Sequence, residues 1–538
     1  MRFLVWHPSV WVVCWAWLIG WFHYKIPLFL IERREVVMQK FLDPLQKHFE
    51  QVSLLASTQS VLEWDERTGL PEGASEYRAN QLSQLSGMVH ERRTDPRIRE
   101  WLDDLDTATS QHDDNSFERA LWRNWKRDYD RDTQLPAKLV QALTKAIALG
   151  QHAWGRAKST RDFAAFLPNL KEIIQLKREE AAILAKPGTP IYDALLDQYE
   201  EGLTSIRAKS MFDSIKQPFI RLIQAIQGAI QPPDGSSLQG RFPQQQQVQL
   251  CHWIAEQIGF DFHRGRLDVT EHPFCTTLGP RDHRILTRYF EDHFASGFFG
   301  TLHEAGHGMY EQGLPTAWYG MPPGQYASLG VHESQSRLWE NMIGRSRAFW
   351  EWCLPHVRRF FPTMGDADVR RFYRDINRVS PSLIRVEADE ATYNLHVLIR
   401  FEIEEAIFAN QLEAEDLPRA WNERYTNYLG VTPSHDGEGV LQDVHWSAGL
   451  FGYFPTYTLG NIYAAQLMIA AEKALGSIDA LVRRGEFQAL LEWLRTNIHA
   501  HGRRYRPSEL VEKATSEPIQ ADHLVNYLTT KLSDVYGL

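Results

Sequence analysis

Cysteine is scarce in this sequence. The 538 residues contain four cysteines, and no two of them are separated by only two residues. Without a C-x-x-C pair they predict neither a disulfide framework nor a cysteine-ligated metal, and they fit a reducing compartment. The cysteines are Cys14, Cys251, Cys275 and Cys353. We therefore expect a cytoplasmic protein.

Positive charge is also limited, and no basic tract interrupts the body of the chain. Lys and Arg number 58 against 68 Asp and Glu, which gives a formal net charge of −10. Proteins that bind nucleic acid carry clustered basic residues, so we expect no nucleic-acid partner. The hydrophobic fraction of 43% and the charged fraction of 23% are those of a globular protein with a sizeable core.

Long apolar runs are absent except at the N-terminus. The run from Pro8 to Phe22 is too short to span a membrane comfortably, and Lys25 interrupts its continuation. It could be a membrane anchor or an uncleaved secretory segment, or Met38 could be the true start of the protein. We therefore treat 1–37 as an apolar extension and expect a membrane partner only if the mature protein retains it.

Helical periodicity dominates the rest of the chain. From Met38 to about 250, apolar residues recur at three- and four-residue spacing, which predicts long amphipathic helices that form a scaffold or lid. Short β-branched or alternating runs between 262 and 289 predict a small antiparallel sheet, whose edge could bind an extended peptide. We expect one mainly α domain over 38–538.

The most informative stretch is the pentad His303-Glu304-Ala305-Gly306-His307. On a helix, residues four apart lie on one face, so the two imidazoles can bind one zinc ion while Glu304 lies beside them as a general base. A catalytic zinc usually has three protein ligands, and Glu333 on a second predicted helix is the third. A pair of surface histidines, or of hydrogen-bonded core histidines, is the alternative.

Further helices are expected after the pentad. The pattern predicts helices over 336–361 and 366–379, and a long one from Ser382 to about Ala409. The long helix would place Arg385 and Asp389 at the spacing of an ion pair, and a solvated salt bridge is then the simplest reading of Arg385. The stretch 439–457 is rich in glycine, polar and aromatic residues, as functional loops often are.

Several motifs occur in a fixed order, and together they resemble those of the carboxypeptidase Taq family of zinc metallocarboxypeptidases. The similarity extends from about Met38 to the C-terminus. Its motifs are Trp64-Asp65-x-x-Thr68-x-x-Pro71, Asp282-x-Arg284, His303-Glu304-x-x-His307, His332-Glu333-Ser334-Gln335, Ile384-Arg385-x-x-Ala388-Asp389 and Gly439-x-x-Gln442-Asp443-x-His445-Trp446.

The resemblance implies an almost wholly helical fold with a deep groove, a zinc site at the groove's floor and a homodimer. It also implies removal of single residues from peptide C-termini with broad specificity, usually sparing proline, with Zn²⁺ or Co²⁺ as the ion. One position departs from the family pattern, because Leu286 stands where the family has threonine and Thr287 follows one place later. On a strand that shift turns the side chain to the other face, so we expect altered detail and retained activity.

The catalytic hypothesis assigns the proton transfers to Glu304. Zinc held by His303, His307 and Glu333 would activate water for attack on the scissile carbonyl. The oxyanion needs a further donor, and His445 with Tyr453 or Tyr457 are the choices that the sequence leaves open.

Recognition of the terminal carboxylate calls for an arginine, since a guanidinium binds a carboxylate through two hydrogen bonds. Arg385 is the first choice and Arg284 the second. Asp389, Gln442 and Asp443 would orient the arginine or a ligand imidazole, although Gln442 and Asp443 could instead cap a helix or loop.

Two other functions remain open at this point. An endo-acting or dipeptide-releasing zinc peptidase would use the same groove without a carboxylate-binding arginine. A non-catalytic peptide-binding protein would have no reason to keep Glu304 beside a complete set of ligands.

Overall fold

Helices make up most of the structure, a computed structural model that describes residues 28–362, 364 and 368–538. The expected helical fold class is confirmed. The α-helices are α1 (Leu28–Thr68), α2 (Ser75–Arg93), α3 (Arg97–Thr109), α4 (Phe117–Gln134), α5 (Ala137–Thr160), α6 (Phe163–Leu184), α7 (Ile191–Tyr199), α8 (Ser205–Gln227), α9 (Gln244–Ile258), α10 (Phe294–Gly313), α11 (Leu329–Arg337), α12 (Arg347–Phe360), α13 (Val369–Ile376), α14 (Tyr393–Phe408), α15 (Leu417–Leu429), α16 (Pro455–Leu475), α17 (Ile478–Arg483), α18 (Gln488–Asn497), α19 (Pro507–Thr515) and α20 (Asp522–Tyr536).

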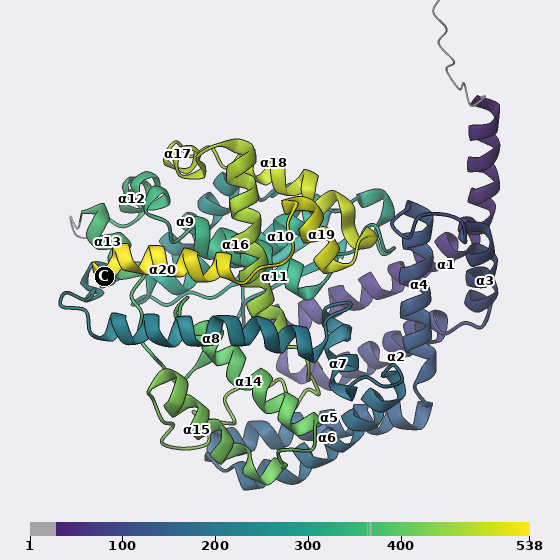
Figure 1. Ribbon diagram of the computed structural model, residues 1–538, viewed down its shortest axis with the longest axis horizontal. Helices are drawn as coiled ribbons and strands as arrows, with labels where there is room; N and C mark the ends of the chain where they lie inside the picture. Colours follow the sequence, from purple (N-terminus) through teal and green to yellow (C-terminus); the bar gives the residue numbers. More distant parts are fainter. Residues whose placement is uncertain (1–27, 363, 365–367) are drawn as a thin grey trace, which may run out of the picture.

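Within the described ranges, the apolar residues form two buried clusters. The larger one includes Ala146 and Tyr536 and takes in side chains from most of the helices between them. The smaller one joins α1, α3 and α4 through residues such as Leu45, Leu105 and Trp125, and these helices lie together at one side of the molecule (Figure 1). Near the middle, α10 and α11 pack against each other and α11 packs against α16.

The sheet is mixed rather than wholly antiparallel as expected. Its strands are β1 (Gly265–Val269), β2 (Phe274–Gly279) and β3 (Asp282–Thr287), in the order β1-β3-β2. The hairpin of β2 and β3 is antiparallel, but β1 pairs with the other edge of β3 and runs parallel to it. Runs of strand-forming residues predict where strands lie but not their order, so the parallel pair was not foreseen.

Two of the predicted helices are broken. The stretch 336–361 contains the end of α11, a π-helical turn over Leu338–Ile343 and then α12. The stretch from Ser382 contains only a short 3₁₀ turn over Arg385–Glu387 before α14 begins at Tyr393.

Asp389 explains the late start of α14. Its carboxylate accepts hydrogen bonds from the backbone N–H groups of Ala391 and Thr392, each at 3.0 Å. Such local bonds stabilise a turn in place of helix. Arg385 consequently forms its ion pair with Asp443. The ion pair between Arg385 and Asp389 that the four-residue spacing predicted is therefore wrong.

Parts of two predictions lie outside the described residues. They are the apolar run from Pro8 to Phe22 and the beginning of the helix expected over 366–379, of which the structure describes α13. Within the described ranges, no helix combines the length and the apolar character that crossing a membrane requires.

Candidate metal centre and peptide groove

The pentad lies on α10, and α11 brings Glu333 to it. The metal-binding atoms of His303, His307 and Glu333 all lie within 4.8 Å of one another. Glu333 Oε2 is 3.8 Å from His303 Nε2 and 3.5 Å from His307 Nε2. Two imidazole nitrogens and one carboxylate oxygen at this separation are a donor set that suits zinc.

The other ring nitrogen of each histidine is held by a neighbouring side chain. His303 Nδ1 is 2.8 Å from Glu340 Oε2, and His307 Nδ1 is 2.5 Å from His332 Nδ1. His332 is fixed in turn by Glu311, whose Oε1 is 2.9 Å from His332 Nε2. These contacts leave both Nε2 atoms facing Glu333, the orientation that a shared metal ion needs.

Arg337 orients the carboxylate of Glu333. Its Nε donates to Glu333 Oε1 at 2.6 Å, which leaves Oε2 for the two histidines. Against the effect of burial, Arg337 and His303 hold the pKa of Glu333 well below its usual range. Glu333 and Glu340 in turn raise the pKa of His303 although burial opposes them, so the carboxylates favour positive charge at this point.

Glu304 lies beside the donor set and is only 6% exposed. Burial raises the pKa of its carboxyl to about 7, and Glu333 adds to the rise although His303 opposes it. Among the described side chains none donates a hydrogen bond to this carboxylate. Glu304 is therefore free to exchange a proton with a bound molecule.

Two glycines allow the helices of the site to approach closely. A Cβ at Gly306 of α10 would lie 2.6 Å from Ser336 Cα, and one at Gly460 of α16 would lie 2.5 Å from Glu333 Cγ. Both distances are far below van der Waals contact. The position of Glu333 thus depends on the absence of a side chain at Gly460.

We expect Gly460→Ala to weaken metal binding, because the added methyl group would displace Glu333 from the histidines. A loss of roughly ten- to a hundred-fold in affinity is usual when the support of a ligand is disturbed. Titration of the apoprotein against a competing chelator measures it. Gly155→Ala in α5, where a Cβ meets nothing within 4 Å, is the control, and equal affinities for the two variants would contradict this role of Gly460.

The donor set opens into a cavity of about 690 Å³. Side chains of β2, α10, α11 and the start of α16 form its walls. Tyr453 and Tyr457 both line it, as do Cys275 and Thr276 of β2. The strand that forms one edge of the sheet therefore runs beside the metal site, as the sequence predicted.

The stretch 439–457 supplies a buried network behind this cavity. Asp443 Oδ1 accepts from Arg385 Nε and Nη2 at 3.1 and 3.0 Å, and Asp443 Oδ2 accepts from Arg400 Nε at 2.6 Å. Gln442 Oε1 accepts from the Arg385 backbone N–H at 2.9 Å and from Arg400 Nη2 at 2.8 Å. Gln442 and Asp443 thus position two arginines, and Arg385 itself is 5% exposed.

His445 lies between this network and the cavity. Its Nε2 is 3.4 Å from the Tyr457 hydroxyl, and its Nδ1 is 3.8 Å from Asp443 Oδ1. Burial lowers the pKa of His445 to about 3, and Arg385 and Arg400 contribute although Asp443 opposes them. His445 is therefore neutral, and its contact with the cavity is made through the Tyr457 hydroxyl.

Arg284 has a different setting: it does not line the metal cavity, although on β3 it pairs with Thr276 of β2, which does. Its Nε and Nη2 donate to Asp282 at 2.9 Å, and its guanidinium lies 4.1 Å from the centre of the Trp64 ring. Two of the sequence motifs therefore meet here and attach α1 to the sheet. Leu286 and Thr287 are fully buried on β3, and Thr287 Oγ1 contacts the Gly297 carbonyl oxygen at 3.5 Å.

The sequence assigned no role to several residues of the site. They are Glu311, His332, Arg337, Glu340 and Arg400. Glu340 and Arg337 follow Glu333 at seven and four residues, a helical spacing that could have suggested a shared face. Arg400 gave no comparable signal, because its partners come from a distant loop.

Comparisons with known proteins agree with this geometry. The family model described as carboxypeptidase Taq (M32) metallopeptidase matches residues 44–532. Thermostable carboxypeptidase 1 of Thermus thermophilus is 45% identical over 495 residues, which are 90% of this chain and 97% of the relative. Carboxypeptidase 1 of Bacillus subtilis is 39% identical over 502 residues, which are 93% of this chain and 99% of that protein.

A solved structure extends the similarity to the fold. The crystal structure of the M32 carboxypeptidase from Deinococcus radiodurans R1 superposes with a TM-score of 0.89 at 37% identity, and it covers 93% of this chain and 100% of that chain. The match thus includes the helices and the sheet that surround the metal centre. This chain belongs to the carboxypeptidase Taq (M32) family of metallopeptidases.

Proposed function

We propose that this protein uses zinc to release single amino acids from the C-termini of peptides, with broad specificity for the residue released. Family membership makes it a metallocarboxypeptidase, a peptide hydrolase that needs a divalent metal. The observation that carries the proposal is the convergence of His303, His307 and Glu333 in one cavity with Glu304 unengaged beside them.

The chain's own residues account for the proton transfers. When bound, the metal supplies Lewis-acid chemistry by polarising the scissile carbonyl and making water more acidic. Glu304 lines the same cavity, and we assign it to accept the proton of the attacking water and to deliver it to the leaving amine. His303, His307 and Glu333 hold the ion, and Glu340, His332 and Arg337 orient those three.

Tyr457 is our assignment for the donor to the oxyanion. Both Tyr453 and Tyr457 line the cavity, but only the Tyr457 hydroxyl lies within 3.4 Å of His445 Nε2. We assign the Nε2–H tautomer to neutral His445, so that Nε2–H donates to the Tyr457 oxygen and the hydroxyl proton of Tyr457 is left for the oxyanion. An oriented hydroxyl can meet the negative charge as it develops without reorganising first.

Arg385 is our assignment for the group that recognises the terminal carboxylate. Its side chain lies beside Tyr457, with the guanidinium carbon 5.0 Å from the ring centre. Asp443 and Tyr393 accept hydrogen bonds from Nε, Nη2 and Nη1, which engage three of the five N–H groups of a guanidinium. One N–H on each terminal nitrogen remains for a carboxylate.

We expect Arg385→Lys to raise KM for free-carboxylate peptides at least tenfold, because an ammonium cannot reproduce the two-bond contact. Amidated peptides, which carry no terminal carboxylate, should stay intact with wild type and with the variant. Steady-state kinetics of both proteins on one free-carboxylate peptide measure the change in KM. Arg424→Lys is the matched control, because Arg424 pairs with Glu402 outside the network, and an unchanged KM in Arg385→Lys would remove this role.

Three finer points belong to the same proposal. Zinc is the working ion, with cobalt as the alternative that the same donor set would accept. The protein is a cytoplasmic homodimer. Metal analysis of the purified protein and light scattering in solution test the ion and the oligomeric state directly.

Product analysis tests the reaction itself. Metal-loaded protein is incubated with peptides of about ten residues, and the products are identified by mass spectrometry over time. The proposal predicts a ladder that shortens by one residue at a time from the C-terminus. Dipeptides or internal fragments would instead support the endo-acting or dipeptide-releasing reading.

A further inference from the structure

A second cavity of about 660 Å³ adjoins the metal cavity. The two share the wall residues Ser60, Tyr319, Gly320, Gln325, Tyr326 and Leu329. Its remaining walls come chiefly from α1, α4 and the end of α7, together with Arg503 from the 3₁₀ segment between α18 and α19. A molecule that leaves the metal cavity along these shared walls therefore enters the second one.

The charges that line the two cavities differ. Among the described residues, the lining of the metal cavity contains no lysine or arginine, but it includes Glu304, Glu311 and Glu333. The second cavity is lined by four arginines and three acidic residues: Arg93, Arg127, Arg131, Arg503, Asp128, Asp132 and Glu201. Cationic groups are therefore concentrated at one end of the combined groove.

Two of these arginines already have acidic partners. Arg503 donates to both carboxylate oxygens of Asp128, at 2.8 and 3.0 Å, and Arg127 donates to Asp197 Oδ2 at 3.0 Å. Within each pair the two charges neutralise each other. Arg503 and Arg127 therefore add little electrostatic attraction for a negatively charged ligand.

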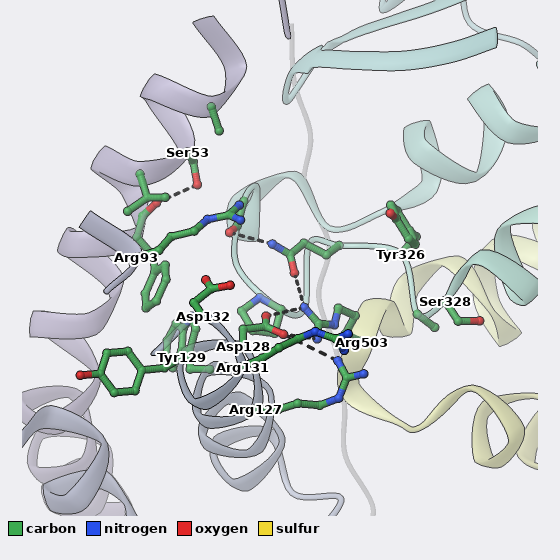
Figure 2. Close-up of a pocket in the computed structure, with 18 of the residues that line it drawn as sticks. Ser53, Arg93, Arg127, Asp128, Tyr129, Arg131, Asp132, Tyr326, Ser328 and Arg503 are labelled. Atoms are coloured by element: carbon green, nitrogen blue, oxygen red, sulfur yellow. Dashed lines mark hydrogen bonds and ion pairs between the residues drawn. The ribbon is translucent and has the colours of Figure 1, made fainter. Parts of the chain in front are cut away.

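Arg93 and Arg131 differ from these two, because neither forms an ion pair or hydrogen bond through its side chain with the described part of the chain. Arg93 is exposed at the end of α2, and Arg131 Nη2 is buried without a hydrogen-bond partner. Asp132 is the opposing charge, and it too lacks a direct partner. Figure 2 shows Arg93 and Asp132 extending from α2 and α4 into the cavity.

From these observations we propose that the second cavity binds the side-chain carboxylate of an acidic residue that precedes the scissile bond of the peptide. The inference rests on the proposed function. Release of a single residue leaves the rest of the peptide on one side of the metal, so the part that reaches the second cavity lies before the cleaved bond. Arg93 and Arg131 supply the attraction, and Asp132 limits it.

Matched peptides test this inference. A series of free-carboxylate peptides carries Glu or Gln at one position between three and six residues before the C-terminus, with the same terminal residue throughout. At the position that reaches the cavity, wild type should process the Glu peptide with a kcat/KM about two- to five-fold higher, mainly through KM, as befits a partly exposed ion pair. The ratio should fall toward one as salt rises.

Two variants that remove charges of opposite sign should change the ratio of kcat/KM for the Glu and Gln peptides in opposite directions. Arg93→Gln should lower the Glu/Gln ratio and Asp132→Asn should raise it, because the first removes an attracting charge and the second a repelling one. Lys138→Gln is the control, since Lys138 is exposed on α5 and does not line the cavity. Arg131→Gln is a less suitable test because that side chain is partly buried and its loss could disturb folding.

Three results would overturn the inference. The Glu/Gln ratio could be one at every position, or it could be unchanged in both Arg93→Gln and Asp132→Asn. Arg93→Gln could also raise KM equally for both peptides, in which case the cavity binds the terminal carboxylate of the chain. If no peptide is trimmed at all, the proposed function fails instead, so the two failures are distinguishable.

Discussion

Glu304→Gln is expected to lower kcat by roughly 10²- to 10⁴-fold while the protein keeps its metal. The amide has nearly the shape of the carboxylate but cannot accept the proton of the attacking water. Because Glu304 lies next to His303 in sequence and contributes no atom to the donor set, the variant should bind metal as wild type does.

Metal content and kcat must therefore be measured on the same preparation. Metal analysis after dialysis gives the first, and release of free amino acid from an unblocked peptide gives the second. Glu311→Gln is a useful comparison, because Glu311 lies on the same helix and in the same cavity but is engaged by His332 and Thr277. Substantial activity in metal-loaded Glu304→Gln would mean that another group is the base.

Tyr457→Phe is expected to lower kcat by about 10²- to 10³-fold with little change in KM, as loss of one oxyanion donor does. The phenyl ring keeps the packing against Tyr393 and Arg385, so stability should change little. What disappears is the hydroxyl that faces His445 at 3.4 Å.

Tyr453→Phe is the matched control, since Tyr453 lines the same cavity and lacks the His445 contact. Steady-state kinetics on one peptide decide between the two tyrosines. A larger loss of kcat in Tyr453→Phe would transfer the donor role to Tyr453. Equal and small losses would mean that neither tyrosine stabilises the oxyanion.

The local pattern around the pentad was sufficient to predict that His303, His307 and Glu333 come together. Spacing of four residues places His303 and His307 on one face of α10, and the need for a third ligand pointed to Glu333 on α11. The helical fold class was predictable for a similar reason, because apolar periodicity reports local structure directly. The three strands also all lie between 262 and 289, the stretch in which the sequence predicted a sheet.

Interactions between distant segments were not predictable in this way. Arg385 was expected on a long helix beside Asp389, but Asp389 stabilises the turn before α14 and Asp443 holds Arg385. No local sequence pattern indicates that the partner of Arg385 is a residue in a loop 58 residues away. The parallel pairing of β1 with β3 was missed for the same reason, since strand order depends on tertiary packing.

The roles of two glycines in helix packing also could not be predicted from the sequence. Gly306 and Gly460 look like ordinary helix residues of low propensity, yet each marks a close approach of two helices at the metal centre. Their function becomes apparent only from the structure, in which Ser336 packs against Gly306 and Glu333 packs against Gly460. Helix packing therefore determines the ligand geometry that the pentad alone could only suggest.

The most direct test of the account is a metal titration with two peptides. Apoprotein is titrated with Zn²⁺ while release of free amino acid is followed from an unblocked peptide and from its C-terminally amidated twin. We predict that activity on the unblocked peptide rises to a plateau at one metal ion per chain and that the amidated peptide stays intact. Cleavage of both peptides, or activity that does not depend on metal, would contradict a metallocarboxypeptidase built on His303, His307 and Glu333.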